Sequence, residues 1–157
     1  LEHVYRGLGL TEQNVHAIGH GTGSNGKSSE ECRDVIRSYH IKLMAGLAEK
    51  LRSLPEGDGT MLDNTMIVYL SDAGEAHHGA LHEWPFLVLG GCGGRLKIPG
   101  NYIRMPDYGQ AGHGTIGNFY TSILNAYGDP IEHFGDPDFE LEREGLPQRG
   151  PVPSLIV

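Results

Sequence analysis

Residues 63–94, DNTMIVYLSDAGEAHHGALHEWPFLVLGGCGG, decide the predicted fold. They contain two apolar runs of strand length, residues 66–70 and 85–90, which are rich in β-branched or aromatic side chains and end in turn residues. Ligands bind beyond the carboxyl ends of strands in open α/β sheets, so we interpret the polar segment between the runs as a site. Its candidate side chains are Asp72, Glu75, His77, His78, His82 and Glu83.

The composition indicates a folded, loop-rich and acidic chain. Its 157 residues are enough for one domain with a core, and its 24 glycines and 9 prolines predict many turns. The formal net charge of −8 argues against a nucleic-acid partner or an anionic-membrane surface, because both need clustered Lys and Arg. No apolar run approaches the roughly 18 residues of a membrane span, and we recognise no targeting signal.

A long helix from about residue 29 to residue 53 is the clearest local prediction. Ser28 and Glu31 have the spacing of a capping box at its start, and Pro55 follows its end. Apolar side chains recur at three- and four-residue steps and predict one buried face: Cys32, Val35, Ile36, Tyr39, Leu43, Leu47, Leu51 and Leu54. We interpret His40, at the edge of this stripe, as a partly buried structural histidine.

The two cysteines leave two interpretations open. Cys32 on the helix stripe is most simply a small core residue. Cys92 lies in the glycine-rich run of residues 90–94, which we interpret as a turn that needs positive φ, in preference to an anion-binding nest. One possible bridge between Cys32 and Cys92 defines no disulfide framework, so the redox compartment stays open.

The rest of the chain predicts a flexible loop, a second helix and a tail. Residues 21–27, GTGSNGK, lack the spacing of a phosphate-binding loop, so we interpret them as a linker or mobile site loop. An apolar pattern predicts a helix over residues 114–127, ended by Gly128. Residues 129–157 form an extended Pro-rich tail that wraps the surface or is partly loose. We expect residues 1–157 to be a single domain or the C-terminal fragment of a larger α/β domain.

Five of the nine histidines gather in two places that could share a metal ion, His16 with His20 and His77, His78 with His82. His16 and His20 are four residues apart, so they lie on one face if the backbone there is helical. Asp72 and His82 could complete a set of three imidazoles and one carboxylate, which suits Zn, Fe and related ions. His77 and His78 are additional candidates, of which an extended chain lets at most one reach the ion. The simpler alternative is a set of solvated loop histidines.

Residues 62–72, LDNTMIVYLSD, resemble the Asp-Asn-Thr, apolar strand and Ser-Asp segment of sulfatases, which belong to the alkaline-phosphatase-like superfamily. The order of features is similar to that of secreted bacterial families distantly related to this superfamily. These features are the segment from His16 to His20, the long helix, residues 62–72, residues 82–94, and the closing segment from residue 127 to 136. Residues 62–94 carry the most specific part of the likeness.

The resemblance implies an α/β fold with a mixed or mostly parallel sheet flanked by helices, of which this chain is the C-terminal part. It also implies that His16, His20 and His82 hold one divalent metal ion (Zn, Ca, Mg or Mn), with His16 in place of the family's acidic ligand. Asp72 matches a ligand of a second ion. The implied function is metal-dependent hydrolysis of phosphate or sulfate esters, with a small anionic substrate, in a periplasmic or secreted protein.

Two departures from the family pattern favour an alternative function. Ala73 stands where a histidine ligand of the second ion is found, although His77 or His78 could replace it. The strand that carries the family's nucleophile would precede Leu1, and neither Ser24 nor Ser71 has an assigned base, so no catalytic residue is named. The alternative is a non-catalytic metal- or ligand-binding module with a degenerate hydrolase site.

Overall fold

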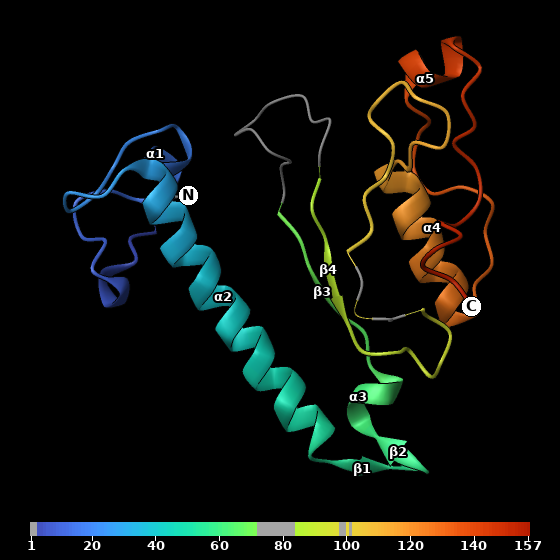
Figure 1. The fold of residues 1–157 in the computed structure, drawn as a ribbon, viewed down its shortest axis with the longest axis horizontal. Coiled ribbons are helices and arrows are strands. Elements are labelled where there is room, and N and C mark those ends of the chain that lie inside the picture. The colour runs from blue at the N-terminus through green and yellow to red at the C-terminus, as the bar shows by residue number, and fades with distance from the viewer. Residues whose placement is uncertain (1–2, 72–83, 98–99, 101) are drawn as a thin grey trace. The chain divides into compact units, whose positions relative to one another are not determined.

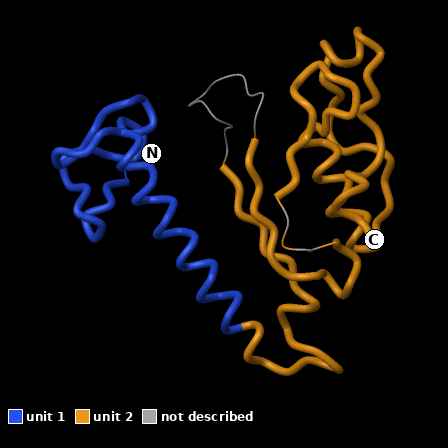
Figure 2. The backbone as a smooth tube through the Cα atoms, viewed as in Figure 1, with its two compact units in different colours: residues 1–50 blue, residues 51–157 orange. Residues whose placement is uncertain are grey.

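The computed structural model describes residues 3–71, 84–97, 100 and 102–157 (Figure 1). The chain divides into two compact units, Leu1–Lys50 and Leu51–Val157, which we call the N-terminal unit and the C-terminal unit (Figure 2). Within the described ranges, no helix is both long and apolar enough to cross a bilayer.

The N-terminal unit is built around four buried apolar side chains. Its elements are the 3₁₀ helix η1 (Arg6–Leu8), α1 (Val15–Gly19) and most of α2 (Ser29–Arg52). Each element supplies part of an apolar cluster whose buried members are Leu10, Ile18, Cys32 and Ile36. His40 on α2 is half-buried and lies 2.9 Å from the hydroxyl of Tyr5, which confirms the structural interpretation of this histidine.

The bounds of the long helix α2 agree with the sequence prediction to within one residue at its end, but the predicted buried face is wrong in its middle, where Tyr39, Leu43 and Leu47 are exposed. The backbone N–H of Ser28 donates to Glu31 Oε2 at 2.7 Å, and the N–H of Glu31 donates to Ser28 Oγ at 3.2 Å, so the predicted capping box is present. The backbone hydrogen bond from Ser28 is the main reason why the pKa of Glu31 is lowered. Cys32 is fully buried, as predicted for a small core residue. Both cysteines are free thiols.

The C-terminal unit begins with two short strand pairs. β1 (Pro55–Glu56) pairs antiparallel with β2 (Gly59–Thr60), and the helical turn α3 (Met61–Asn64) follows. β3 (Ile67–Tyr69) and β4 (Leu87–Leu89) pair antiparallel, with Val68 opposite Val88 (Figure 1). The two strands predicted from the apolar runs are therefore confirmed. The strand pairs in the described part of the chain are antiparallel, so the larger alkaline-phosphatase-like sheet stays a prediction.

The glycine-rich turn after β4 is hydrogen-bonded to the backbone just before β3. The N–H of Cys92 donates to the carbonyl of Thr65 at 3.2 Å, and the N–H of Gly93 donates to the carbonyl of Asp63 at 2.8 Å. A Cβ on Gly90, where φ is +89°, would lie 2.2 Å from the Thr65 carbonyl oxygen. The predicted turn with positive φ is confirmed, and two of its amides bind backbone carbonyls and are not available to an anion.

The core of the C-terminal unit lies against α4 (Ile116–Tyr127), the second predicted helix. Phe119 on α4 stacks on Phe86 beside β4, with ring centroids 4.0 Å apart. Thr115 caps the start of α4, and Gly128 ends it at a φ of 89°. The buried members of this cluster are Cys92, Leu96, Phe119, Ala126, Val152 and Leu155.

The Pro-rich segment after α4 contributes to this core. It contains the short helix α5 (Phe139–Arg143), on which Leu141 is buried. The N–H of Lys97 donates to the Leu155 carbonyl at 2.9 Å, and Leu96 bridges to Ile156. Val152 and Leu155 are buried members of the Phe119 cluster, so the end of the chain is packed rather than loose. Proline spacing gives no sign of this packing, because long-range contacts create it.

Candidate functional site

His16 on α1 and His20, which caps the end of this helix, form a pair, as the helical interpretation of their spacing predicts. Asn14 caps this short helix by accepting a hydrogen bond from the N–H of Ala17 at 2.8 Å. One turn then brings the two imidazoles together, with ring centroids 4.6 Å apart and planes at 71°. Both side chains are exposed, so solutes can reach the pair from solvent.

The other predicted ligands, Asp72, His77, His78 and His82, lie outside the described residues. Across the described ranges, no group of three or more His, Cys, Asp or Glu side chains is placed to hold a metal ion. The residues on either side of the undescribed segment are joined, because Trp84 Nε1 donates to the Ser71 carbonyl at 2.9 Å. Trp84 therefore has a hydrogen-bonding role at this point.

The chemistry of the histidine pair narrows the choice of metal. Imidazole nitrogen is a good ligand for Zn, Cu, Fe and Ni, whereas Ca and Mg prefer oxygen ligands. Two imidazoles on one helical turn can each offer a nitrogen to the same ion, and a structural or catalytic zinc site needs at least one more protein ligand. His16 and His20 thus fit two positions of a zinc-type site better than they fit a calcium or magnesium site.

A cluster of buried polar side chains in the C-terminal unit has no counterpart in the sequence predictions. Asn118 on α4 donates from Nδ2 to the carbonyls of Gln148 at 3.0 Å and Gly150 at 2.8 Å. Ser122, one turn later, accepts a hydrogen bond from the N–H of Val152 at 2.8 Å. The only sequence signal was the presence of polar residues, Asn118, Thr121, Ser122 and Asn125, on a mainly apolar helix. These contacts fix the irregular backbone of the final segment against α4.

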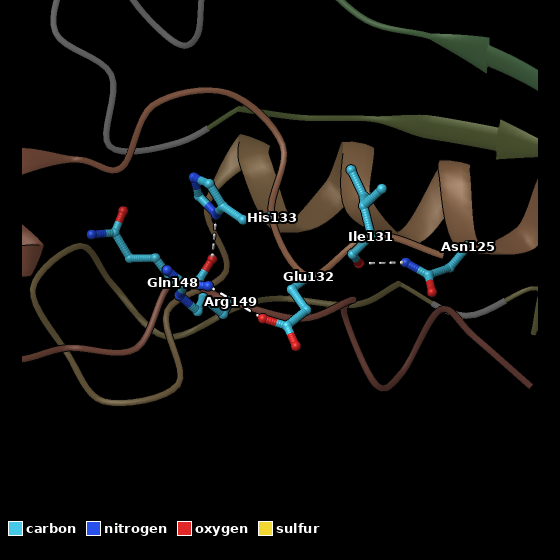
Figure 3. Close-up of polar contacts among 6 residues, drawn as sticks. All are labelled: Asn125, Ile131, Glu132, His133, Gln148 and Arg149. Carbon is cyan, nitrogen blue, oxygen red and sulfur yellow. Dashed lines mark hydrogen bonds and ion pairs between the residues drawn. The ribbon is translucent and has the colours of Figure 1, made fainter. Parts of the chain in front are cut away.

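Further side chains of α4 and of the segment after it extend this network (Figure 3). His133 Nδ1 lies 3.1 Å from the Gln148 carbonyl oxygen, and since a carbonyl can only accept, Nδ1 carries the proton. Asn125 Nδ2 donates to the Ile131 carbonyl at 3.1 Å, and Arg149 pairs with Glu132 at 3.2 Å. Most of these partners are backbone carbonyls, which indicates a structural role for the network.

A second polar cluster joins Tyr108 to the start of α5. The Tyr108 hydroxyl donates to Asp138 Oδ1 at 2.9 Å and lies 3.4 Å from Glu140 Oε2. Local desolvation, followed by this hydrogen bond and the two nearby carboxylates, raises the pKa of Tyr108 to about 12. The phenol is therefore a proton donor at neutral pH and not a base. His113 is half-buried and packs edge-on against the Tyr108 ring, with Nδ1 2.9 Å from the Pro106 carbonyl oxygen.

Asp138 is the carboxylate at the centre of this cluster. Desolvation acts to raise its pKa, but hydrogen bonds from the N–H of Leu141, the Tyr108 hydroxyl and the N–H of Glu140 outweigh that effect. The pKa of Asp138 is therefore lowered, and the side chain acts as the N-cap of α5. Its hydrogen bonds are used to hold the chain in place.

A cleft of about 580 Å³ lies elsewhere in the C-terminal unit, beside the glycine-rich turn. Its lining consists of Arg52, Thr60, Leu62, Asp63, Gly90, Gly91 and Leu96. Asp63, its one carboxylate, accepts hydrogen bonds from the backbone and hydroxyl of Thr60 at 2.7 and 2.8 Å. Neither His16 nor His20 is among these lining residues, so the cleft adds nothing to the metal prediction.

No protein-family model, curated protein or solved structure matches the chain. The functional argument therefore depends on the residues of the chain itself. Of the candidate residues that the structure describes, His16 and His20 are the ones that it brings together.

Proposed function

We propose that the chain is part of a metal-dependent hydrolase of phosphate or sulfate esters, and that His16 and His20 hold the metal ion. The observation that supports this proposal is the exposed pair of imidazoles on α1, 4.6 Å apart between ring centroids. Asp72 and His82 enter as further ligands from the sequence alone. A two-histidine set favours zinc among the divalent ions that the sequence suggests.

The residues of the chain would position the ion. The Asn14 cap fixes the single turn of α1, and this turn keeps His16 and His20 on one face. Imidazole binds metal only in its neutral form, so acidification should weaken binding. When bound, the ion would polarise the ester oxygens and stabilise the charge that develops during hydrolysis.

A non-catalytic metal-binding module is the second candidate. The observation that favours it is Ala73, which stands where the resembled family has a histidine ligand for its second ion. No nucleophile is assigned within this chain. In this alternative, His16 and His20 still bind metal but no ester is hydrolysed.

Zinc titration of the full chain by isothermal calorimetry tests metal binding at His16 and His20, which both candidate functions require. We expect His20→Ala to weaken zinc binding at least about tenfold, because it removes one of two neighbouring ligands. His3→Ala is the matched control, since it removes another exposed imidazole of the same unit. Equal zinc affinity in the wild-type chain and in His20→Ala would contradict the metal assignment.

A panel of phosphate and sulfate monoesters, assayed on the zinc-loaded protein, separates the two candidates. Zinc-dependent turnover that His20→Ala abolishes supports the hydrolase. Tight zinc binding without turnover of any ester supports the non-catalytic module. A protein that neither binds zinc nor turns over an ester would contradict both.

A further inference from the structure

Residues 24–27, SNGK, form a closed two-residue hairpin turn in the N-terminal unit. Ser24 and Lys27 exchange two backbone hydrogen bonds, each 3.1 Å long. Asn25 and Gly26 occupy the two central positions with φ values of 53° and 76°. Positive φ at both positions is the mark of a type I′ turn, for which Asn-Gly is a preferred sequence. The loop predicted to be a linker or mobile segment is thus a tight turn.

The Asn25 carboxamide is bound on the side of the turn that faces Thr11. Its Oδ1 accepts from the Thr11 N–H at 2.7 Å, from Thr11 Oγ1 at 3.3 Å and from Ser24 Oγ at 2.9 Å. Its Nδ2 lies 3.0 Å from Thr11 Oγ1. Glu12 Oε2 accepts the Asn25 backbone N–H at 2.6 Å. Several hydrogen bonds therefore join the turn to the segment before α1. We call this set of contacts the Asn25 clasp.

Asn-Gly is also the dipeptide most prone to deamidation, because glycine places no side chain in the path of the reaction. The backbone nitrogen of Gly26 attacks Cγ of Asn25 and loses its proton, and the Cγ–Nδ2 bond breaks to release ammonia. Water then opens the resulting succinimide to leave aspartate or isoaspartate. Among the six asparagines of the chain, only Asn25 precedes a glycine.

The folded turn holds the reacting atoms apart. Ring closure requires the Gly26 nitrogen and the Asn25 Cβ to lie on the same side of the Asn25 Cα–C bond. In a type I′ turn they lie on opposite sides, and rotating that bond would break the two hydrogen bonds between Ser24 and Lys27. We infer that Asn25 is a latent deamidation site. It does not react while the Asn25 clasp holds the turn closed, and it reacts when this turn opens.

The modification would prevent the turn from closing again. Isoaspartate adds one atom to the main chain, so the two-residue turn between Ser24 and Lys27 loses its register. Either product also places a carboxylate beside Glu12, whose own carboxylate already accepts the backbone N–H at position 25. Like charges at this distance repel. Once the turn has opened and Asn25 has deamidated, the N-terminal unit therefore does not return to its original structure.

Peptide mapping by mass spectrometry tests this inference on the full chain, incubated at mildly alkaline pH with and without urea. We expect deamidation at Asn25 to be about tenfold slower or more in the folded chain, because the reaction waits for local opening. Thr11→Val removes the Thr11 Oγ1 contacts and keeps the backbone N–H, so it should speed deamidation of the folded chain and leave the rate in urea unchanged.

Thr22→Val is the matched control, because Thr22 is an exposed threonine of the same unit outside the Asn25 clasp. It should deamidate at the wild-type rate in both conditions. Equal rates at Asn25 in the folded and the urea-unfolded wild-type chain would overturn the inference. A folded Thr11→Val chain that reacts no faster than wild type would overturn the role of the clasp.

Discussion

The two units bury their backbone polar groups in different ways. In the N-terminal unit, four buried apolar side chains form the core, and short-range turns and caps satisfy most of the surrounding backbone. In the C-terminal unit, an apolar core around Phe119 is combined with buried polar side chains, of which Asn118 and Ser122 bind the backbone of a distant segment. The second arrangement depends far more on contacts between residues remote in sequence.

The difference follows from how much regular structure each unit has. The long helix α2 satisfies its own backbone hydrogen bonds, so apolar contact is sufficient to hold the segments against it. The segment after α4 is irregular apart from α5, so its carbonyls and amides need partners from elsewhere. Asn118, Ser122 and Gln148 supply those partners from buried positions, where an unsatisfied group would be costly.

Gly90→Ala should have the largest effect on stability and should act on the C-terminal unit. The new Cβ would lie 2.2 Å from the Thr65 carbonyl at a φ of +89°. The turn after β4 would therefore have to move away from the backbone before β3. We expect the free energy of unfolding, measured by urea denaturation, to fall by more than about 4 kcal/mol. Gly94→Ala, also at positive φ but with open space around it, should cost only about 1–2 kcal/mol. Equal losses for the two variants would contradict the close approach at Gly90.

Ile36→Ala tests the apolar core of the N-terminal unit. Ile36 is 7% exposed within the four-residue core, so truncation should lower the free energy of unfolding by about 3 kcal/mol. Ile41→Ala is the control on the same helix, because Ile41 is 45% exposed. Its effect should stay within about 1 kcal/mol. A similar loss in both variants would show that this core does not determine the stability of α2.

Asn118→Ala tests the polar anchor of the C-terminal unit. It removes the side-chain donor to the Gly150 carbonyl, one of the two donors to the Gln148 carbonyl and the cap contacts to Thr115. We expect a loss of about 2–3 kcal/mol in urea denaturation, together with faster proteolysis after residue 128. Asn64→Ala removes one exposed hydrogen bond to Glu56 and should change stability by less than about 1 kcal/mol. Unchanged proteolysis in Asn118→Ala would count against the anchor.

Asp138→Asn should produce the smallest effect, a change in the titration of one side chain. Loss of this carboxylate should move the pKa of Tyr108 down from about 12, because an ionised neighbour no longer opposes the phenolate. Ultraviolet absorbance of the tyrosines, with Tyr108→Phe to identify the signal, measures the change. Asn also caps helices well, so α5 should persist. An unaltered Tyr108 titration would show that Asp138 does not set this pKa.

The same pair predicts a pH dependence of stability with a definite sign. The pKa of Asp138 is lower in the folded chain than in the unfolded chain, so its contribution is complete above the unfolded value of about 3.9 and is lost as the pH falls through the folded value. The pKa of Tyr108 is raised, so its contribution is present below about pH 10 and is lost as the pH rises toward about 12. Urea denaturation at stepped pH values should show both losses, and the acid loss should be smaller in Asp138→Asn, because the lowered pKa of Glu31 still contributes to it.

Local patterns predicted the elements well where short-range physics decides them. The Ser28 capping box and the apolar spacing were enough for α2, and Gly128 marked the end of α4. The spacing of His16 and His20 predicted that their rings meet only if the backbone there is helical, and the structure supplies that helix as α1. The turn at Asn25 was not recognised, although Asn-Gly is its usual sequence, because the flanking residues lack a strand pattern.

The sequence by itself determined the two long helices, the two apolar strands and the glycine turn, because each depends on neighbours within a few residues or one turn. Only the tertiary structure decided that β3 and β4 run antiparallel and that the final segment supplies Val152 and Leu155 to the core. It also decided which polar side chains are buried, since Asn118 and Gln148 meet across thirty positions of chain. The physical reason is that burial and backbone pairing depend on partners remote in sequence, which local periodicity does not encode.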